Sequence, residues 1–399
     1  MNQLDTLFSM TEDLNTNSDE DADIVSDSES AQSLIQYYVE QERSLSLQRT
    51  YILHMSCSQG VADKLFLGLS NCTSVVYDIE TLSKVACLSG HDRTITGVKV
   101  GAGEDDVVFT SSLDGTIKLW DLRLHNNMVR EYKDASEGDD KLKPISSFDI
   151  SSKKTVIAAG TELFDGDAFM LFWDARSSKL LGGYWESHRD DITHIQFHPS
   201  KKDWLATGST DGLMNVFDIS ECSEDDALLY SMNTESSVDK LQWFMCLNEV
   251  DGLSCITHTQ DLQVWETDGV IPYAKHMQRD IIAKVMHRTS SDYCYLVDFL
   301  PEDSDDEVSL LAGSTAGKGE CLKMLKVQKK TLTPVAVFNG NKQIVRSCCS
   351  IKQKNLLVTG GESGFFTLWK SDGLSQNISA ASLKVKTKSK HSSVGKKPY

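Results

Sequence analysis

The 399-residue chain lacks the long apolar run that a membrane helix requires. Its longest stretches without Asp, Glu, Lys or Arg are 13 residues, 50–62 and 65–77, whereas a membrane-spanning helix needs about 20 apolar residues. Positive charge is also scarce, because 40 Lys and Arg face 58 Asp and Glu, for a net charge of −18. Duplex nucleic acid is bound largely through Lys and Arg contacts to phosphate. We therefore expect neither a membrane nor duplex nucleic acid as a partner.

The ten cysteines include no C-x-x-C pair, the spacing typical of many zinc and redox sites. Most of them lie among apolar or β-branched residues, as small buried side chains do. The acidic N-terminus has no apolar core of the kind found in secretory signals. The sequence therefore predicts free thiols and an intracellular location, nuclear or cytoplasmic.

Charge is distributed unevenly along the chain. Residues 1–42 carry eleven acidic groups and no Lys or Arg, residues 376–399 carry six Lys and no acid, and the part between carries −13. Segments with few apolar residues and charge of one sign favour disorder. We therefore expect a disordered acidic head over residues 1–32, a folded region over 33–373 and a disordered basic tail over 374–399.

A repeated pattern dominates the middle of the chain. His91 is followed 29 residues later by Trp120, and His188 is followed at the same distance by Phe217. In both units an Asp-Gly dipeptide separates two apolar or alternating segments, which is the strongest short-range signal of a β-hairpin. The two units therefore predict repeated antiparallel hairpins of similar length.

The last strand of this unit recurs along the chain. Its aromatic or large apolar residue returns at intervals of 43 to 60 residues. The seven anchor positions are Tyr77, Trp120, Trp173, Phe217, Trp265, Leu325 and Trp369. The two longest intervals contain charged insertions, 134–140 and 302–307, which are typical of loops. Seven similar units result.

These units resemble the WD40-repeat family, whose repeats of about 40–45 residues each form a four-stranded blade of a β-propeller. The resemblance covers roughly residues 45–370 and implies an all-β fold, a single seven-bladed WD40-type propeller. It also implies a buried hydrogen-bond set in each intact blade. This set comprises His91, Thr110, Asp114 and Trp120 in the second unit, and His188, Thr207 and Asp211 in the fourth. In the seventh unit Asn341 and Ser363 occupy the His and Asp positions.

Closing such a ring requires an outer strand for the last unit. After Trp369 the chain becomes polar and then basic, so it cannot supply that strand. The segment 33–42 is rich in Leu, Ile, Tyr and Val. We expect it to pair with the seventh unit, because an unpaired sheet edge invites association with other chains.

Sequence patterns that resemble a nucleotide-binding or metal-binding site are explained better by this fold. Residues 313–319 read G-S-T-A-G-K-G, one residue too short for a phosphate-binding loop. His194 and His198 have the ligand spacing of a helix, but on a strand they lie about 13 Å apart, and His188 has its role in the blade. We therefore expect no enzyme, no cofactor, no metal site and no small-molecule substrate. A catalytic pair among the many loop carboxylates remains an alternative.

Two features favour protein partners. Arg123 and Arg176 each follow Trp-Asp-x in successive units. These boxes resemble the WDxR boxes of propellers that dock on the damaged-DNA-binding adaptor of cullin–RING ubiquitin ligases, and a guanidinium is a rigid fork of donors that suits such a role. The alternative is that each arginine pairs with a neighbouring acid. The acidic body favours a basic partner, unless its charge is simply a solvated surface.

The sequence thus predicts a monomeric, non-enzymatic protein–protein interaction scaffold. Two alternatives stay open, a substrate receptor that docks on a ubiquitin-ligase adaptor and an acidic chaperone for a basic nuclear or ribosomal protein. We expect the contact surface at the end that carries the loops before His91 and His188. The residues expected there are Arg93, Leu113, Arg189, Asp190 and Thr210.

Overall fold

The structure is a computed structural model, and strands form most of it. It describes residues 34–45, 50–58, 63–101, 103–124, 127–134, 136, 141–245, 251–269, 272, 274–300, 308–328 and 331–372. The acidic head and the basic tail predicted over residues 1–32 and 374–399 lie outside this part, as do the charged segments 137–140 and 302–307. The predicted boundaries of the folded region therefore stay predictions.

Five sheets contain four antiparallel strands each. The first comprises β2 (Ile52–Cys57), β3 (Lys64–Leu69), β4 (Thr73–Asp78) and β5 (Lys84–Ser89). The second comprises β6 (Ile95–Val100), β7 (Val107–Ser112), β8 (Thr116–Asp121) and β9 (Asn127–Lys133). The third comprises β10 (Ile145–Ile150), β11 (Val156–Thr161), β12 (Met170–Asp174) and β13 (Leu180–Tyr184). The fourth comprises β14 (Ile192–Phe197), β15 (Trp204–Ser209), β16 (Leu213–Asp218) and β17 (Leu228–Asn233), and the fifth β18 (Val238–Met245), β19 (Asp251–Thr257), β20 (Leu262–Glu266) and β21 (Ala274–Met277).

A sixth sheet has eight strands and contains the N-terminal strand. Its order is β22 (Cys294–Leu300), β23 (Val308–Ser314), β24 (Leu322–Gln328), β25 (Thr331–Asn339), β1 (Ile35–Ser44), β28 (Phe365–Ser371), β27 (Leu356–Gly361) and β26 (Val345–Ile351). The strand β1 pairs antiparallel with β28 along its length and parallel with the end of β25. The expected ring-closing segment is thus the outer neighbour of the last three strands. Divided between β25 and β1, this sheet gives two further four-stranded units, and the count of seven blades stays a prediction that depends on this division.

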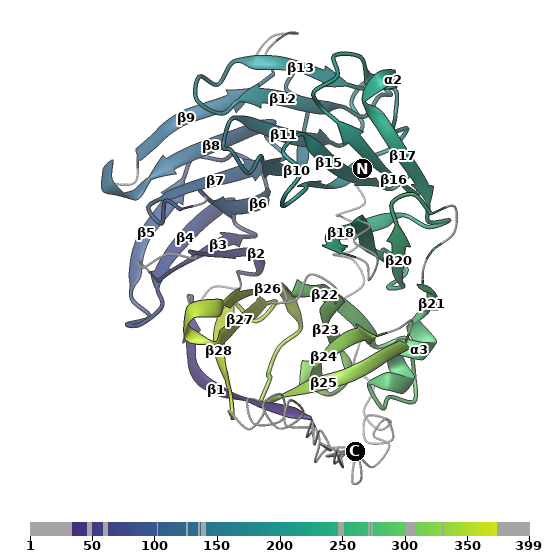
Figure 1. Cartoon of the computed structure of the whole chain (residues 1–399). Coiled ribbons are helices and arrows are strands. Elements are labelled where there is room, and N and C mark those ends of the chain that lie inside the picture. Colours follow the sequence, from purple (N-terminus) through teal and green to yellow (C-terminus); the bar gives the residue numbers. More distant parts are fainter. Residues whose placement is uncertain are drawn as a thin grey trace, which may run out of the picture.

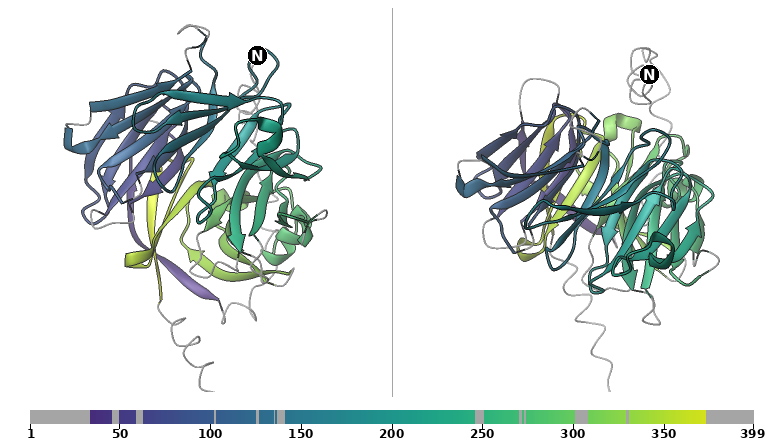
Figure 2. Two further views of the ribbon diagram at one scale, coloured as in Figure 1. Left: turned by 45° about the horizontal axis from the view of Figure 1, so that its top comes forward. Right: turned by 90° about the horizontal axis from the view of Figure 1, so that it is seen from above.

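The sheets are arranged around a common centre (Figure 1), and Figure 2 shows the same ring from two other directions. The first strands of consecutive sheets lie next to one another around this centre, as β2 does beside β6 and β26. The core therefore lies between neighbouring sheets rather than in one central mass. Ile117 packs toward the third sheet and Trp120 toward the first, because alternate residues of β8 point to opposite faces.

All seven anchor residues lie on the third strand of a four-stranded unit and are buried. The turns that precede these strands explain the Asp-Gly pairs. Gly115 and Gly212 have φ values of +83° and +86°, a left-handed conformation that glycine adopts without a steric penalty.

Helices are few and short in the described residues. They are α2 (Glu224–Ala227), α3 (Arg279–Val285) and the 3-10 turns η3 (Leu122–Leu124), η4 (Ala316–Gly319) and η5 (Lys352–Lys354). None of the described helices has the length and apolar character needed to cross a membrane. The sequence did not predict α3, which lies in the longest interval between anchor residues and buries Ile282 and Ala283 in the core between the fifth sheet and β22–β25.

The prediction of free thiols is wrong for two cysteines. Cys57 on β2 and Cys349 on β26 form a disulfide with Cα atoms 6.3 Å apart. The two residues are separated by 292 positions in the sequence, and they meet only because the ring places the first strand of the last unit beside the first strand of the first. No other disulfide forms among the described residues.

Candidate protein-interaction surface

One end of the ring is held by buried hydrogen bonds in the second sheet. Nδ1 of His91 lies 2.8 Å from Oδ2 of Asp114, and Nε2 lies 2.8 Å from Oγ1 of Thr110. The indole Nε1 of Trp120 donates to the same Oγ1 at 2.9 Å. Because the carboxylate accepts, Nδ1 of His91 donates, and Nε2 accepts the proton of the Thr110 hydroxyl. The four side chains named in the sequence therefore form one continuous chain of hydrogen bonds.

The carboxylate of Asp114 also fixes the turn that contains it. It accepts hydrogen bonds from the backbone N of Asp92, the backbone N of Thr116 and the Thr116 hydroxyl, at 3.1, 3.0 and 2.7 Å. Burial alone raises the pKa of Asp114, but the hydrogen bonds from His91 and Thr116 outweigh it and lower the pKa to about 2. The group is therefore ionised wherever the protein is folded near neutral pH.

The fourth sheet has the same arrangement without the indole. His188 lies 3.0 Å from Asp211 and 2.7 Å from Thr207 through its two ring nitrogens. Phe217 occupies the position of the tryptophan and is fully buried. In the last unit Trp369 donates to Thr359 at 2.8 Å, whereas the buried Oδ1 of Asn341 has no hydrogen-bond partner. Because most of these polar side chains are buried, the networks hold the sheets together rather than face solvent.

The contact residues expected from the sequence at this end are near the same turns. Arg93 donates to the carbonyl of Leu113 at 3.1 Å. The backbone N of Arg189 donates to Asp211, and the Asp190 carboxylate accepts from the next backbone N. Arg189 is exposed. The choice of this end as the contact surface stays a prediction.

The three histidines that resembled a metal cluster have separate partners. His188 belongs to the buried network, and His198 lies 3.0 Å from Asp251. Burial lowers the pKa of His194 to about 3, with repulsion from Lys99, Lys240 and His54 adding to the effect. No group of three or more His, Cys, Asp or Glu side chains in the described part of the chain could hold a metal ion.

The opposite end of the ring carries the two WDxR boxes. Arg123 forms a two-point contact with Asp121, with Nε and Nη2 at 2.9 and 2.7 Å from its oxygens. Arg176 makes a longer contact of 3.4 Å with Asp174. The side chains of Arg123 and Arg176 are 62% and 74% exposed. Both arginines follow the third strand of their sheet, so they lie at the same end in successive sheets.

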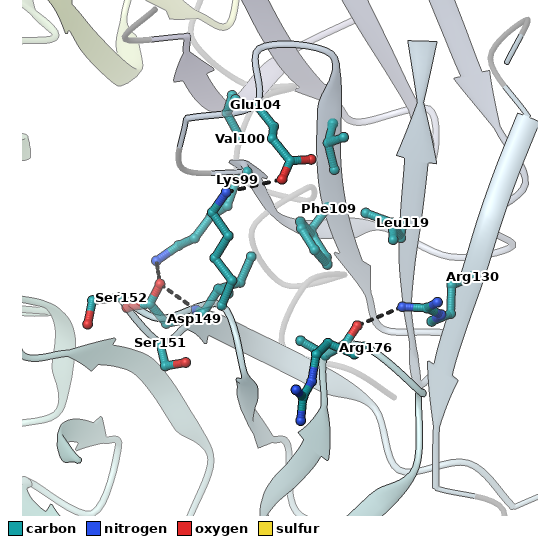
Figure 3. Close-up of a pocket in the computed structure, with 15 residues that line it drawn as sticks. Lys99, Val100, Glu104, Phe109, Leu119, Arg130, Asp149, Ser151, Ser152 and Arg176 are labelled. Atoms are coloured by element: carbon teal, nitrogen blue, oxygen red, sulfur yellow. Dashed lines mark hydrogen bonds and ion pairs between the residues drawn. The ribbon is translucent and has the colours of Figure 1, made fainter. Parts of the chain in front are cut away.

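A cavity of about 530 Å³ opens at this end between the second and third sheets (Figure 3). Val107, Phe109, Leu119 and Ile150 contribute apolar surface and pack against the core between the two sheets. The charged residues that line it are Lys99, Glu104, Arg130, Asp149, Lys154 and Arg176. Four cations and two carboxylates thus surround an apolar surface, in a chain that is acidic as a whole.

Comparisons with known proteins agree with this geometry. A family model described as WD domain, G-beta repeat matches residues 82–121, 179–218 and 332–370. An uncharacterized WD repeat-containing protein of Schizosaccharomyces pombe is 32% identical over 319 residues, which cover 76% of this chain and 90% of that protein. The chain belongs to the WD40-repeat family.

Other relatives extend this assignment. The WD repeat-containing protein 89 homolog of Dictyostelium discoideum is 23% identical over 329 residues, 82% of this chain and 85% of that protein. The mouse DNA damage-binding protein 2 is 29% identical over 144 residues, 36% of this chain and 31% of that protein. The predicted WD40-repeat family and all-β propeller class are thus confirmed. WD40-repeat proteins generally act as scaffolds for protein interactions.

Sequence reasoning missed most of the cavity in this WD40-repeat protein. Its lining comes from the end of β6 and the turn after it, from β7, β8 and β9, from the end of β10 and the turn after it, and from the residues that follow β12. The ring brings these segments together. Of the charged lining residues only Arg176 carried a signal in the sequence, through its WDxR box. A lysine at the end of an inner strand, such as Lys99, is indistinguishable in the sequence from a solvated one.

Proposed function

We propose that this WD40-repeat protein is a non-enzymatic scaffold that binds a partner protein at the end carrying Arg123 and Arg176. The observation that supports this choice is that two exposed arginines from successive sheets lie at the same end of the ring as a partly apolar cavity, which one of them lines. Arg176 lines that cavity, and Arg123 follows the third strand of the neighbouring sheet at the same end. Arginine is enriched among the residues that contribute most to binding between proteins.

Exposed apolar side chains next to Arg123 extend this surface. Leu124 follows Arg123 directly in η3, and Met128 and Val129 lie on the outer strand β9 of the same sheet. These three side chains are 45 to 54% exposed. Burial of such surface against a partner is favourable by about 25 cal/mol per Å². The opposite end, with Arg93, Arg189 and Asp190, remains the alternative contact surface.

A substrate receptor of a cullin–RING ubiquitin ligase is the second candidate. It is favoured by the presence of two WDxR boxes at one end of the ring. Each arginine already contacts the aspartate of its own box, which is the pairing that a purely structural role predicts. An exposed ion pair contributes little to stability, however, so a partner carboxylate or carbonyl could replace it at small cost.

The third hypothesis, an acidic chaperone, has less support, because carboxylates in the described acidic loops already accept hydrogen bonds within the protein. The Glu224 carboxylate accepts hydrogen bonds from the backbone N of Trp185, Glu186 and Ser187. Asp191 accepts from the backbone N of Leu163. These carboxylates join loops that lie far apart in the sequence, so they already have partners within the protein. A role of this kind stays a prediction that depends on segments outside the described residues.

Affinity capture from cells tests the scaffold proposal. Tagged wild-type chain is compared with Arg123→Ala/Arg176→Ala and with the matched control Lys84→Ala/Lys202→Ala, which removes two exposed lysines away from the cavity. We expect the arginine pair to deplete a defined set of partners that the control retains. Identical partner sets for all three proteins would contradict the proposal.

A separate binding assay tests the hypothesis that the protein docks on the ubiquitin-ligase adaptor. Purified damaged-DNA-binding adaptor is incubated with the wild-type chain and with the Arg123→Ala/Arg176→Ala variant. Retention by the wild type and its loss in the variant would support docking through the WDxR boxes. Absence of adaptor binding by the wild type removes the receptor reading and leaves the scaffold proposal standing.

A further inference from the structure

We infer that the cavity between the second and third sheets binds an extended acidic peptide segment of a partner protein, with a large apolar side chain of that segment seated in the cavity. This inference rests on the proposed scaffold function and names the chemistry of the partner. The cavity of about 530 Å³ lies within the range of 300–1,000 Å³ that is typical of ligand pockets.

The floor selects an apolar group. Phe109 is buried in the core between the sheets, and Val107, Leu119 and Ile150 pack against that core while still lining the cavity. An apolar side chain placed there removes both its own surface and theirs from water. Because the floor belongs to the strands β7 and β8 and to the end of β10, it is rigid before the ligand arrives.

The rim selects negative charge. Asp149 is already satisfied, because it accepts from Lys99 at 2.6 Å and from the backbone N of Ile150 and of Phe197. Arg130 donates to the carbonyl of Ala175 at 2.8 Å through one of its nitrogens. This contact uses one of the five N–H groups that an arginine carries.

The outer rim holds two further exposed cations. Lys154 lies 3.2 Å from Glu104 in an exposed pair, and the side chain of Arg176 makes a long contact of 3.4 Å with Asp174. The lining carries four cations against two carboxylates, so it is locally positive although the chain carries −18. Complementary charge of this kind favours carboxylates on both sides of the apolar group.

The extent of the site indicates a chain-like ligand rather than a small molecule. A second, more open hollow of about 440 Å³ shares Lys99, Val100 and Gly101 with the first. It continues toward Cys57 and Cys349 in the middle of the ring. Two hollows that share one wall suit an extended backbone crossing from the outer rim to the centre.

Fluorescence anisotropy tests the inference on the full chain. The probe is a fluorescein-labelled peptide of sequence Glu-Asp-Glu-Leu-Phe-Glu-Asp-Glu. We expect saturable binding that weakens with added salt. A peptide with Ser-Ser in place of Leu-Phe, and one with Lys in place of the acids, should each bind at least tenfold more weakly. Absence of binding by the full chain, or equal binding of the three peptides, would overturn the inference.

Variants locate the binding. Lys154→Glu/Arg176→Glu reverses two rim charges, and Ser152→Trp places a ring at the mouth of the cavity from an exposed loop position without disturbing the core. Each should weaken the peptide at least tenfold, whereas Lys84→Glu/Lys202→Glu, with the same change in net charge, should stay within twofold. Binding that none of the cavity variants changes would overturn the inference.

The acidic head of this chain is the competing occupant. Replacing the nine Asp and Glu of residues 1–32 by Asn and Gln separates the two sources of acidic peptide. If the probe binds only after this replacement, the cavity serves the chain's own head and the inference of a partner segment is wrong. If the probe fails while partner capture still depends on Arg123 and Arg176, the inference is wrong and the proposed function stands. If the probe does not bind and partner capture does not depend on Arg123 and Arg176, the proposed function is wrong as well.

Discussion

Replacing Asp114 by alanine tests the buried network most sharply. The carboxylate accepts four hydrogen bonds, from His91, from the backbone N of Asp92 and from the backbone N and hydroxyl of Thr116. The side chains of His91 and Thr116 are buried, so water cannot readily replace the lost acceptor. A buried donor without a partner costs about 1–3 kcal/mol. We expect Asp114→Ala to lower the free energy of unfolding by about 2–5 kcal/mol.

The control for this variant is Asp78→Ala in the first sheet. Asp78 accepts hydrogen bonds from the backbone N and the hydroxyl of Thr81, and both bonds are exposed, so water takes the place of the carboxylate. Urea unfolding followed by tryptophan fluorescence measures both variants. Hydrogen exchange of β7 and β8 then shows whether the loss is local to the second sheet. A cost for Asp114→Ala no larger than that for Asp78→Ala would refute the reasoning.

Three further outcomes follow from particular contacts. Trp120→Phe should cost about 1–2 kcal/mol, the value of one hydrogen bond with a small void, and should leave the ring intact. Desolvation, with repulsion from charged neighbours, lowers the pKa of His54 to about 4 and that of His194 to about 3, whereas an unfolded histidine has a pKa of about 6.5. Between pH 6.5 and 4 only the unfolded state gains protons on these side chains. The free energy of unfolding should therefore fall as the pH drops through this range. Peptide mapping of alkylated, unreduced protein should recover Cys57 linked to Cys349.

Each of these outcomes has a result that contradicts it. A Trp120→Phe variant that fails to fold would show that the indole does more than donate one hydrogen bond. Stability that is flat between pH 6.5 and 4, or unchanged in slope by His54→Gln/His194→Gln, would show that the histidines are solvated in the folded state. Recovery of Cys57 and Cys349 as separately alkylated peptides would contradict the disulfide.

Local pattern was sufficient for the sheets because their residues are contiguous. The spacing from His91 to Trp120 and the Asp-Gly turn at Asp114 are complete within one unit, so the strands around them could be predicted from the sequence alone. The strand β1 could also be predicted from the sequence. A β-rich segment precedes the first unit, and the last unit needs an outer strand that the residues after it cannot supply.

Features that depend on contacts between residues far apart in the sequence could not be predicted. The disulfide joins residues 292 positions apart, and the cavity draws its lining from two sheets. The helix α3 escaped notice because its seven residues are too few to show a periodic pattern. For the disulfide and the cavity, the missing information is the position of one sheet relative to another, which packing between the sheets decides and local sequence does not encode.

Hydrogen–deuterium exchange of the full chain in complex with a captured partner tests most directly which end of the ring does the binding. The account predicts protection of the turns that border the cavity, around Glu104 and Lys154, together with the segment that follows Arg176. Protection confined to the turns at Asp114 and Asp211, with no change around the cavity, would contradict it.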